Sequence, residues 1–394
     1  MRIAVISKSD VRGGGASVVA ANLAKQYNLL GHSADHINLT ETGRLHPYGG
    51  AARVISALKQ WDGRRGYRDH RGWEIRTLQA RRLVSDYDAI HLHDMSTVYS
   101  HEMIAWLAKR AKVIWTIHDC SPFTAGCLYP GACTKFHSAC AACPQTYSWP
   151  IQSSKDRTSE LHKRRRAAIE SSPIHFTAPS RWMIGEFLKG GYGEDRISFV
   201  PNGVDKSIFH PRDREKLRRK YGFDHHQGPI VLFSAAWLHD SRKGPHFAAQ
   251  ICRMIEDINP KLLLVGRYSN EAATIFNGLD VYHAGFIKDD TVRAELFAMA
   301  DMSLMLSEEE NAPLIVLECL ASGTPVFGFD VGGIKEMAKL TKAGHLKKYG
   351  AADMVAHHIK LIFKQKEIRN MFKECEDAVA SYSDIARLYL DQFK

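Results

Sequence analysis

The sequence predicts an α/β protein with two Rossmann-like domains, because strand-like apolar runs alternate with helical segments in both halves. In the first half, the apolar run of residues 2–7 leads through a glycine-rich turn into an alanine-rich helical segment. In the second half, the buried-strand pattern of residues 230–235 is followed by a basic turn and another helical segment. Alternation of this kind builds parallel sheets. The 394 residues are enough for two domains of ordinary size.

The clearest functional pattern lies at residues 303–336, where two strand-like runs flank a short helix. Three residues mark the ends of this helix: Asn311 as the cap, Pro313 in the first turn and Gly323 at the exit. The helix is apolar nearly all round, which predicts burial. It nevertheless contains Glu318, and Glu310 lies just upstream. A buried carboxylate is costly without a hydrogen-bond donor, so the residues alone fit either a ligand site or a core helix whose glutamate meets a backbone donor.

Glu310 and Glu318 are separated by seven residues, and Ala-Ser-Gly-Thr-Pro-Val follows at 321–326. This pattern resembles the signature of glycosyltransferase family 4. Members of that family are retaining enzymes of the GT-B fold, in which two Rossmann-like domains face each other across a cleft. The resemblance implies that Glu310 holds hydroxyls of the donor sugar and that Glu318 holds the ribose of the nucleotide. It also implies that backbone amides line the diphosphate at Asn311, Ala312 and Leu314.

The same resemblance divides the chain. The run Asn-Gly-Val-Asp at 202–205 matches the interdomain segment of the family. We therefore predict an acceptor-binding domain at 1–190 and a nucleotide-sugar-binding domain at 200–375. The GT-B fold implies that the last segment, 376–394, is a helix that crosses back to the first domain.

Two further segments are expected to contact the donor phosphates. Arg242 and Lys243 match the diphosphate clamp of the family, since lysine offers a point charge and arginine can bind two oxygens. The turn at Gly14 and Gly15 lets backbone amides approach a phosphate, although a plain tight turn explains the same glycines. Many relatives have an arginine where Trp237 stands here, so one phosphate contact is missing or is supplied differently.

A His-Asp pair, His118 and Asp119, follows the strand-like run 113–117. The carboxyl end of a parallel strand is where an open α/β sheet presents its site. The family has a histidine in this place, near the donor sugar. We therefore expect a catalytic set of His118, Asp119 and Glu310, with His118 placing the sugar or steering the acceptor proton. The alternative is a histidine that only caps the strand.

The segment 120–143 is rich in cysteine, and a subset of the family carries a similar insert. Cys140 and Cys143 have the spacing of a metal knuckle. Together with Cys127 and Cys133 they can offer four thiolates to a structural zinc ion, which would order a loop with little apolar material. The alternative is a set of free or redox-paired thiols. No catalytic metal is expected, because the donor site of the resembled family uses no divalent ion.

Residues 53–82 are rich in arginine, with Trp61, Tyr67 and Trp73 interleaved. Charges beside aromatic rings suit an anionic membrane surface, single-stranded nucleic acid or a plain solvated face. The resemblance favours a loop that contacts the acceptor or the membrane. The formal net charge of +10 also suits an anionic partner.

No apolar run reaches the roughly 18–20 residues of a membrane-spanning helix, and the N-terminal run is too short for a signal peptide. We expect a cytoplasmic enzyme at the inner face of the cytoplasmic membrane. The predicted function is a retaining hexosyltransferase that moves a sugar from a nucleotide-diphosphate donor to a saccharide or polyprenyl-linked acceptor, in bacterial surface-polysaccharide synthesis. The alternatives are a GT-B-like nucleotide-sugar epimerase and, less favoured, a nucleic-acid-binding module; no nucleic acid partner is expected.

Overall fold

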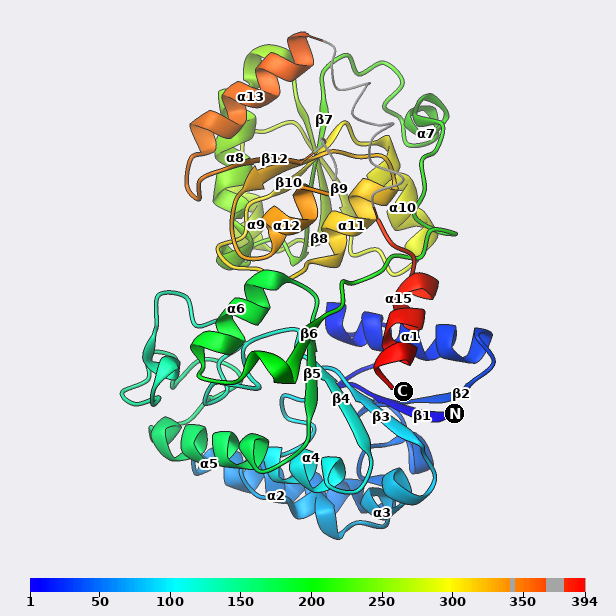
Figure 1. Cartoon of the computed structure of the whole chain (residues 1–394). Helices are drawn as coiled ribbons and strands as arrows, with labels where there is room; N and C mark the ends of the chain where they lie inside the picture. Colours follow the sequence, from blue (N-terminus) through cyan, green and yellow to red (C-terminus); the bar gives the residue numbers. More distant parts are fainter. Residues whose placement is uncertain (341–343, 366–378, 394) are drawn as a thin grey trace. The chain divides into compact units, whose positions relative to one another are not determined.

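The computed structural model describes residues 1–340, 344–365 and 379–393. Contacts divide the chain into two compact units: unit 1 is Met1–Asn202 with Tyr382–Lys394, and unit 2 is Gly203–Ser381 (Figure 1). Within the described residues, each unit holds a six-stranded parallel sheet. The predicted α/β class is therefore confirmed. None of the described helices is long and apolar enough to cross a membrane.

The sheet of unit 1 has the strand order β2-β1-β3-β4-β5-β6. Its strands are β1 (Arg2–Ile6), β2 (Ser33–Ile37), β3 (Ala89–Leu92), β4 (Lys112–Thr116), β5 (His175–Ala178) and β6 (Ile197–Phe199). The chain leaves β1 toward β2 on one side and returns to β3 on the other, so the order reverses between β1 and β3. In β3 and β4, Leu92 pairs with Trp115. Because their carboxyl ends coincide, the residues that follow β3 and β4 are placed side by side.

The helices of unit 1 lie beside this sheet (Figure 1). They are α1 (Gly15–Leu29), α2 (Ala52–Arg64), α3 (Leu78–Ser85), α4 (His101–Ala108), α5 (Thr158–Glu170), α6 (Arg181–Lys189) and α15 (Tyr382–Gln392). The basic stretch 53–82 is mostly α2 and α3, so the predicted loop is wrong. It is helical because Ile55 and Leu58 recur at helical spacing and turn inward, while the arginines take the outer face.

The start of the predicted final helix at 376–378 lies outside the described residues. From Tyr382 onward the chain forms α15, which packs against α1 in unit 1. The Tyr389 hydroxyl lies 2.9 Å from Thr116 Oγ1 of β4 and is buried. A buried hydroxyl needs such a partner, so this contact fixes α15 to the sheet of unit 1.

The sheet of unit 2 has the order β12-β11-β10-β7-β8-β9. Its strands are β7 (Ile230–Trp237), β8 (Lys261–Arg267), β9 (Val281–Gly285), β10 (Met302–Met305), β11 (Val326–Phe329) and β12 (Gly344–Lys347). The chain moves from β7 to β9 in one direction, then returns to β10 and moves to β12 in the other. The order therefore reverses between β7 and β10. Open α/β sheets bind ligands at such a switch point, outside the carboxyl ends of the strands.

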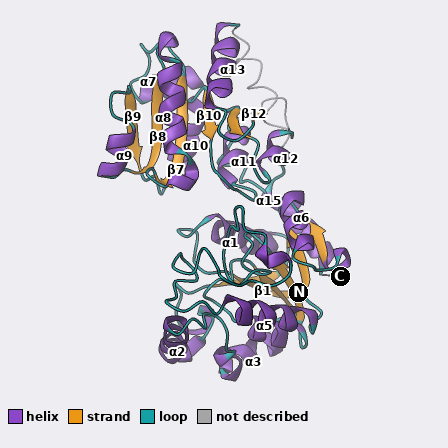
Figure 2. Ribbon diagram, turned by 90° about the vertical axis from the view of Figure 1, so that its left-hand side faces the viewer, coloured by secondary structure: helices purple, strands orange, loops and turns teal. Residues whose placement is uncertain are grey.

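Helices cover both faces of the sheet of unit 2 (Figure 2). They are α7 (Arg214–Lys220), α8 (Pro245–Met254), α9 (Asn270–Ile275), α10 (Asp290–Met299), α11 (Leu314–Ala321), α12 (Ile334–Ala338) and α13 (Ala352–Lys364). One apolar core lies under α7, α10, α11 and α12, and a second lies under α8, α9 and α13. With both faces covered, the central strands β10 and β11 are buried along their whole length, as expected for a parallel sheet.

The buried helix predicted from the sequence is α11, but its start is different. Pro313, not Asn311, is the N-cap, and no side chain caps the helix. Pro313 has ψ 124°, which is extended, and a proline also steers the residue before it away from the helical region, so the helix begins only at Leu314. Gly323 ends the helix in the left-handed region at φ 79°, as predicted. Glu318 is buried within α11, as the apolar pattern indicated.

Candidate functional site

Glu310 lies in the loop between β10 and α11, with only 6% of its side chain exposed. Its Oε1 accepts a short hydrogen bond from Lys243 Nζ and lies 3.4 Å from Arg242 Nη1. The two cations come from a 3₁₀ turn, Ser241–Lys243, after β7. Because β7 and β10 are neighbours in the sheet, the predicted acid and the predicted clamp meet at the switch point.

Two glycines allow the loops to approach this closely. Gly244 has φ 75°, and a Cβ there would collide with the carbonyl oxygen of Leu306. Gly332 has φ 52°, and a Cβ there would collide with the carbonyl oxygen of Glu310. The N–H of Gly333 donates to that same oxygen at 3.0 Å. The backbone of Glu310 is therefore fixed by the turn after β11, while its carboxylate is fixed by the turn after β7.

Glu318 has a different partner. Its Oε1 accepts a hydrogen bond of 2.9 Å from Arg293 Nη2 of α10. Burial raises the pKa of Glu318, although the charge of Arg293 opposes the shift. Arg293 also pairs with Asp290 at 3.1 Å. The structure thus gives each predicted acid its own cation. Sequence reasoning missed Arg293; the signal available was that a lone buried carboxylate needs a donor.

Two helix starts expected near the diphosphate have no side-chain cap. One is α11, which follows Asn311, Ala312 and Pro313; the other is α1, whose N-cap is Gly14 and whose first residue is Gly15. A Cβ on Gly14 would meet nothing within 4 Å, so space is open beside it. The first-turn amides of a helix carry partial positive charge and attract anions.

Trp237 stands at the end of β7, where the resembled family has arginine, and is 50% exposed. Arg267 pairs with it from the end of β8. The guanidinium carbon of Arg267 lies 4.8 Å from the Trp237 ring and 3.9 Å from the Phe286 ring. In the part of the chain that the structure describes, Arg267 forms no ion pair with an acid. A cation missed from the sequence is therefore present one strand away.

In unit 1, two His-Asp pairs stand side by side. His93 Nδ1 lies 3.0 Å from His118 Nε2, and the two rings stack with centroids 5.3 Å apart. His93 and Asp94 follow β3, while His118 and Asp119 follow β4. Burial, and then the charge of Asp119, raise the pKa of Asp94 to about 7. Burial also raises the pKa of Asp119. Sequence reasoning found one pair only, although the same dipeptide ends the preceding strand.

These imidazoles are neutral near pH 7. Burial lowers the pKa of His118 to about 4 and that of His91 to about 3. His91 Nε2 lies 2.8 Å from Thr116 Oγ1, and its Nδ1 lies 3.1 Å from the Tyr27 hydroxyl. A neutral imidazole can donate one hydrogen bond and accept another. Both ring nitrogens of His91 are therefore occupied by hydroxyl groups inside unit 1.

Two sequence models of known families match the chain next to each other. "Glycosyltransferase Family 4" matches residues 13–208, and "Glycosyl transferases group 1" matches residues 213–376. The chain belongs to the group 1 and family 4 glycosyltransferases.

Curated relatives of this glycosyltransferase include N-acetyl-alpha-D-glucosaminyl L-malate synthase of Bacillus anthracis. That protein is 30% identical over 225 residues, which are 56% of this chain and 58% of the relative. The putative colanic acid biosynthesis glycosyl transferase WcaC of Escherichia coli K12 is 25% identical over 240 residues, 59% of this chain and 55% of the relative. The matches span little more than half the length of these two relatives.

Solved structures show the fold. Sucrose-phosphate synthase of Thermosynechococcus elongatus superposes with a TM-score of 0.69 at 18% identity, over 100% of this chain and 99% of the other. HepE of Anabaena in complex with UDP-glucose superposes with a TM-score of 0.66 at 16% identity, with the same coverage. The predicted GT-B fold of this glycosyltransferase is confirmed.

The four cysteines predicted to bind zinc, Cys127, Cys133, Cys140 and Cys143, are free thiols. Cys143 Sγ accepts a hydrogen bond of 3.4 Å from the N–H of Gln145. Across residues 1–340, 344–365 and 379–393, no group of three or more His, Cys, Asp or Glu side chains is arranged to hold a metal ion. The thiols as placed do not fit a four-thiolate site. Structural zinc stays a prediction, which metal analysis of the purified protein tests.

The buried histidines predict a loss of stability in acid. His91 stays neutral in the folded state down to a pKa of about 3, whereas it takes up a proton near pH 6.5 when unfolded. The unfolded state then binds more protons, so the free energy of unfolding falls as the pH falls from 6.5, by about 1.4 kcal/mol per pH unit for His91. Melting midpoints measured between pH 7.5 and pH 4.5 should fall, and those of His91→Gln should fall less steeply. If the melting midpoint of His91→Gln falls with pH as steeply as that of the wild type, this explanation is contradicted.

Proposed function

We propose that this glycosyltransferase moves a hexose from a nucleotide-diphosphate sugar to a saccharide or polyprenyl-linked acceptor, with retention of the anomeric configuration. The observation that carries the proposal is the Glu310 carboxylate, held by Arg242 and Lys243 at the switch point of unit 2. Arg242 and Lys243 offer positive charge to a diphosphate, and the carboxylate of Glu310 can accept hydrogen bonds from sugar hydroxyls.

The difficult event is charge building on the diphosphate as its bond to the anomeric carbon breaks. Arg242, Lys243 and the first-turn amides of α11 are proposed to stabilise that charge, with further amides at Gly14 and Gly15 of α1. When the diphosphate takes over the two cations, the carboxylate of Glu310 is released to accept hydrogen bonds from the sugar. Glu318, supported by Arg293, is proposed to hold the ribose hydroxyls.

We assign the acceptor to unit 1, where the two His-Asp pairs lie. In a front-face transfer, the acceptor oxygen bonds to the anomeric carbon while the bond from that carbon to the phosphate oxygen breaks. The proton of the acceptor hydroxyl passes to the released phosphate oxygen. His118, fixed by His93 at 3.0 Å, is proposed to orient that hydroxyl or the sugar. Asp119 is proposed to act beside it. No step requires a divalent ion in this proposal.

The similar proteins support a nucleotide sugar as the donor class, and the name of one relative fits a role in polysaccharide synthesis. HepE, which shares the fold, was solved with UDP-glucose bound. WcaC carries the name of a colanic acid biosynthesis enzyme. We therefore favour a UDP-sugar or a related nucleotide sugar as donor, and surface-polysaccharide synthesis as the setting.

We further propose that α2 and the segment after it contact anionic lipid headgroups at the inner face of the cytoplasmic membrane. The guanidinium carbon of Arg65 lies 4.6 Å from the Trp61 ring, and that of Arg71 lies between Trp61 and Trp73 at 5.7 and 5.6 Å. Trp61 is 46% exposed. Exposed tryptophan among arginines suits the headgroup region.

The assignment of Glu310 predicts a specific loss in Glu310→Gln. The variant keeps the size of the side chain but removes the charge that accepts sugar hydroxyls. We expect turnover of the nucleotide sugar to fall by about 10-fold or more, since a hydrogen bond to a charged group contributes about 1.5–3 kcal/mol. Binding of the nucleoside diphosphate alone should persist, because Lys243 is no longer neutralised. A thermal-shift panel of nucleotide sugars first identifies the donor, and release of the nucleoside diphosphate then measures turnover.

The matched control for this test is Glu308→Gln, an exposed acid in the same loop. It should leave turnover near the wild-type value. Near-normal turnover in a folded Glu310→Gln protein would refute the assignment.

The membrane proposal predicts that the chain sediments with vesicles containing phosphatidylglycerol and not with vesicles of phosphatidylcholine alone. Arg65→Gln should weaken this binding about fivefold, since one arginine near an anionic surface contributes about 1 kcal/mol. The control is Leu29→Ala on α1, which is also exposed. Equal sedimentation with both kinds of vesicle, or no effect of Arg65→Gln, would count against membrane contact.

A further inference from the structure

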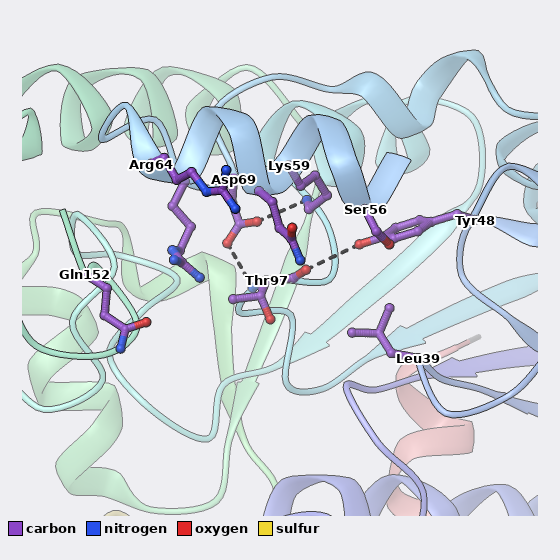
Figure 3. Close-up of a pocket in the computed structure, with 10 residues that line it drawn as sticks. Leu39, Tyr48, Ser56, Lys59, Arg64, Asp69, Thr97 and Gln152 are labelled. Carbon is purple, nitrogen blue, oxygen red and sulfur yellow. Dashed lines mark hydrogen bonds and ion pairs between the residues drawn. The ribbon is translucent and has the colours of Figure 1, made fainter. Parts of the chain in front are cut away.

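A pocket of about 330 Å³ lies wholly within unit 1 and is separate from the residues assigned to the donor. Figure 3 shows α2 running above it, with Lys59 and Arg64 on the helix, Thr97 below, and Gln152 at the left below Arg64. The volume is at the small end of the range for ligand sites, about 300–1,000 Å³. It suits one chemical group or one small ring.

One face of α2 supplies four polar side chains to the lining. Lys59 and Gln60 lie three and four residues after Ser56, and Arg64 lies four residues after Gln60, so the four share one side of the helix. Arg68 joins them from the turn that follows. A Cβ on Gly63 would lie 3.5 Å from Arg68 Nη2, which shows that the guanidinium rests against the end of α2.

The acids near the pocket are already paired. Lys59 Nζ lies 3.0 Å from Asp69 Oδ1 and 3.5 Å from Glu74 Oε1. Burial alone would raise the pKa of Asp69, but the charges of Lys59 and Arg165 outweigh it and hold this pKa below its usual range. Asp69 also accepts a hydrogen bond of 2.8 Å from the N–H of Thr97. The charge of Lys59 is therefore balanced by these two acids.

The remaining two cations have no acidic partner. Among the residues that the structure describes, neither Arg64 nor Arg68 forms an ion pair or a side-chain hydrogen bond, and Arg68 Nε is buried without a partner. Two guanidinium groups therefore border one small pocket with their charge uncompensated. An unpaired buried donor is costly, and an anionic ligand would remove that cost.

Three residues that line the pocket also have strained backbone conformations. Asp69, Thr97 and Gln152 line it with φ values of 53°, 69° and 42°. For a β-branched residue such as Thr97, this left-handed conformation is an outlier. It is held in place by Asp69 and by the Tyr48 hydroxyl, which donates to the carbonyl oxygen of Val98 at 2.6 Å. Such strain persists where the surroundings fix the backbone, and it concentrates at ligand sites.

We propose that this pocket is a subsite for an oxyanion group of the acceptor, a phosphate or a carboxylate, bound by Arg64 and Arg68. The inference rests on the proposed function, which assigns the acceptor to unit 1. An arginine guanidinium matches the planar spacing of two oxyanion oxygens. The side chains of Ser56, Gln60 and Gln152 add hydrogen bonds, which suit the hydroxyls next to such a group. A polyprenyl phosphate and an acidic saccharide share this chemistry.

The test uses the whole chain saturated with UDP, so that the cations of unit 2 are occupied. Inorganic phosphate, D-glucuronate and uncharged glucose are added at equal ionic strength, and affinity is taken from the rise in melting temperature. We expect phosphate or glucuronate to stabilise the chain and glucose to have no effect. Phosphate alone favours a phosphorylated acceptor, and glucuronate alone favours an acidic saccharide.

Arg68→Gln and Arg64→Gln should each weaken anion binding about tenfold, since each removes a charge-assisted contact. Arg64 is exposed, so its variant keeps the test valid if Arg68→Gln fails to fold. The matched control is Arg53→Gln, an exposed arginine of α2 outside the pocket lining, which should bind as the wild type does.

The subsite is overturned if neither anion stabilises the UDP-bound wild type, or if Arg53→Gln weakens binding as much as Arg64→Gln. Failure of the chain to bind UDP or any nucleotide sugar would instead sink the proposed function. In that case anion binding that depends on Arg64 would still show the pocket to be a site.

Discussion

The contact between the Glu310 carboxylate and the two cations Arg242 and Lys243 is the interaction on which the rest depends. It exists because β7 and β10 are neighbours although their first residues lie 72 positions apart in the chain, and because both loops leave the same edge of the sheet. Glycines at 244 and 332 let the backbones approach, so the three charges meet with little freedom to move apart. A buried carboxylate without these cations would be an uncompensated charge. The three groups are also ready to exchange partners when a diphosphate brings its own negative charge and a sugar brings hydroxyl donors.

Unit 1 uses different chemistry at the same kind of position. Its switch point lies between β1 and β3, and the neutral imidazoles of His93 and His118 follow β3 and β4. The charge of Lys8, just after β1, acts on the neighbouring acids Asp94 and Asp119. Basic side chains gather at α2 and the turn after it, where Arg64 and Arg68 border a separate pocket and where Trp61 and Arg65 are exposed. This one stretch therefore has two basic surfaces, which explains why the arginine-rich sequence had no single interpretation.

Much of the fold could be predicted, because the glycine turns and the buried helix depend on local patterns. Glu310, Arg242 and Lys243 were selected through the family resemblance, and the structure adds that neighbouring strands of a parallel sheet bring them into contact. The residues that the sequence analysis missed act through contacts between distant parts of the chain. Arg293 approaches Glu318 from 25 positions away, and Arg267 reaches Trp237 only through the pairing of β8 with β7. The cap at Asn311 was wrong because the proline two residues later delays the helix, and the stretch 53–82 was taken for a loop because its charges masked the helical spacing of its few apolar residues.

The most direct measurement is a crystal structure of the chain with its nucleotide sugar bound. The account predicts that Lys243 and Arg242 contact the diphosphate, and that a Glu310 oxygen lies within hydrogen-bond distance of a sugar hydroxyl, about 2.6–3.2 Å. It would be contradicted by a bound donor that leaves Glu310 paired with Lys243 and turned away from the sugar.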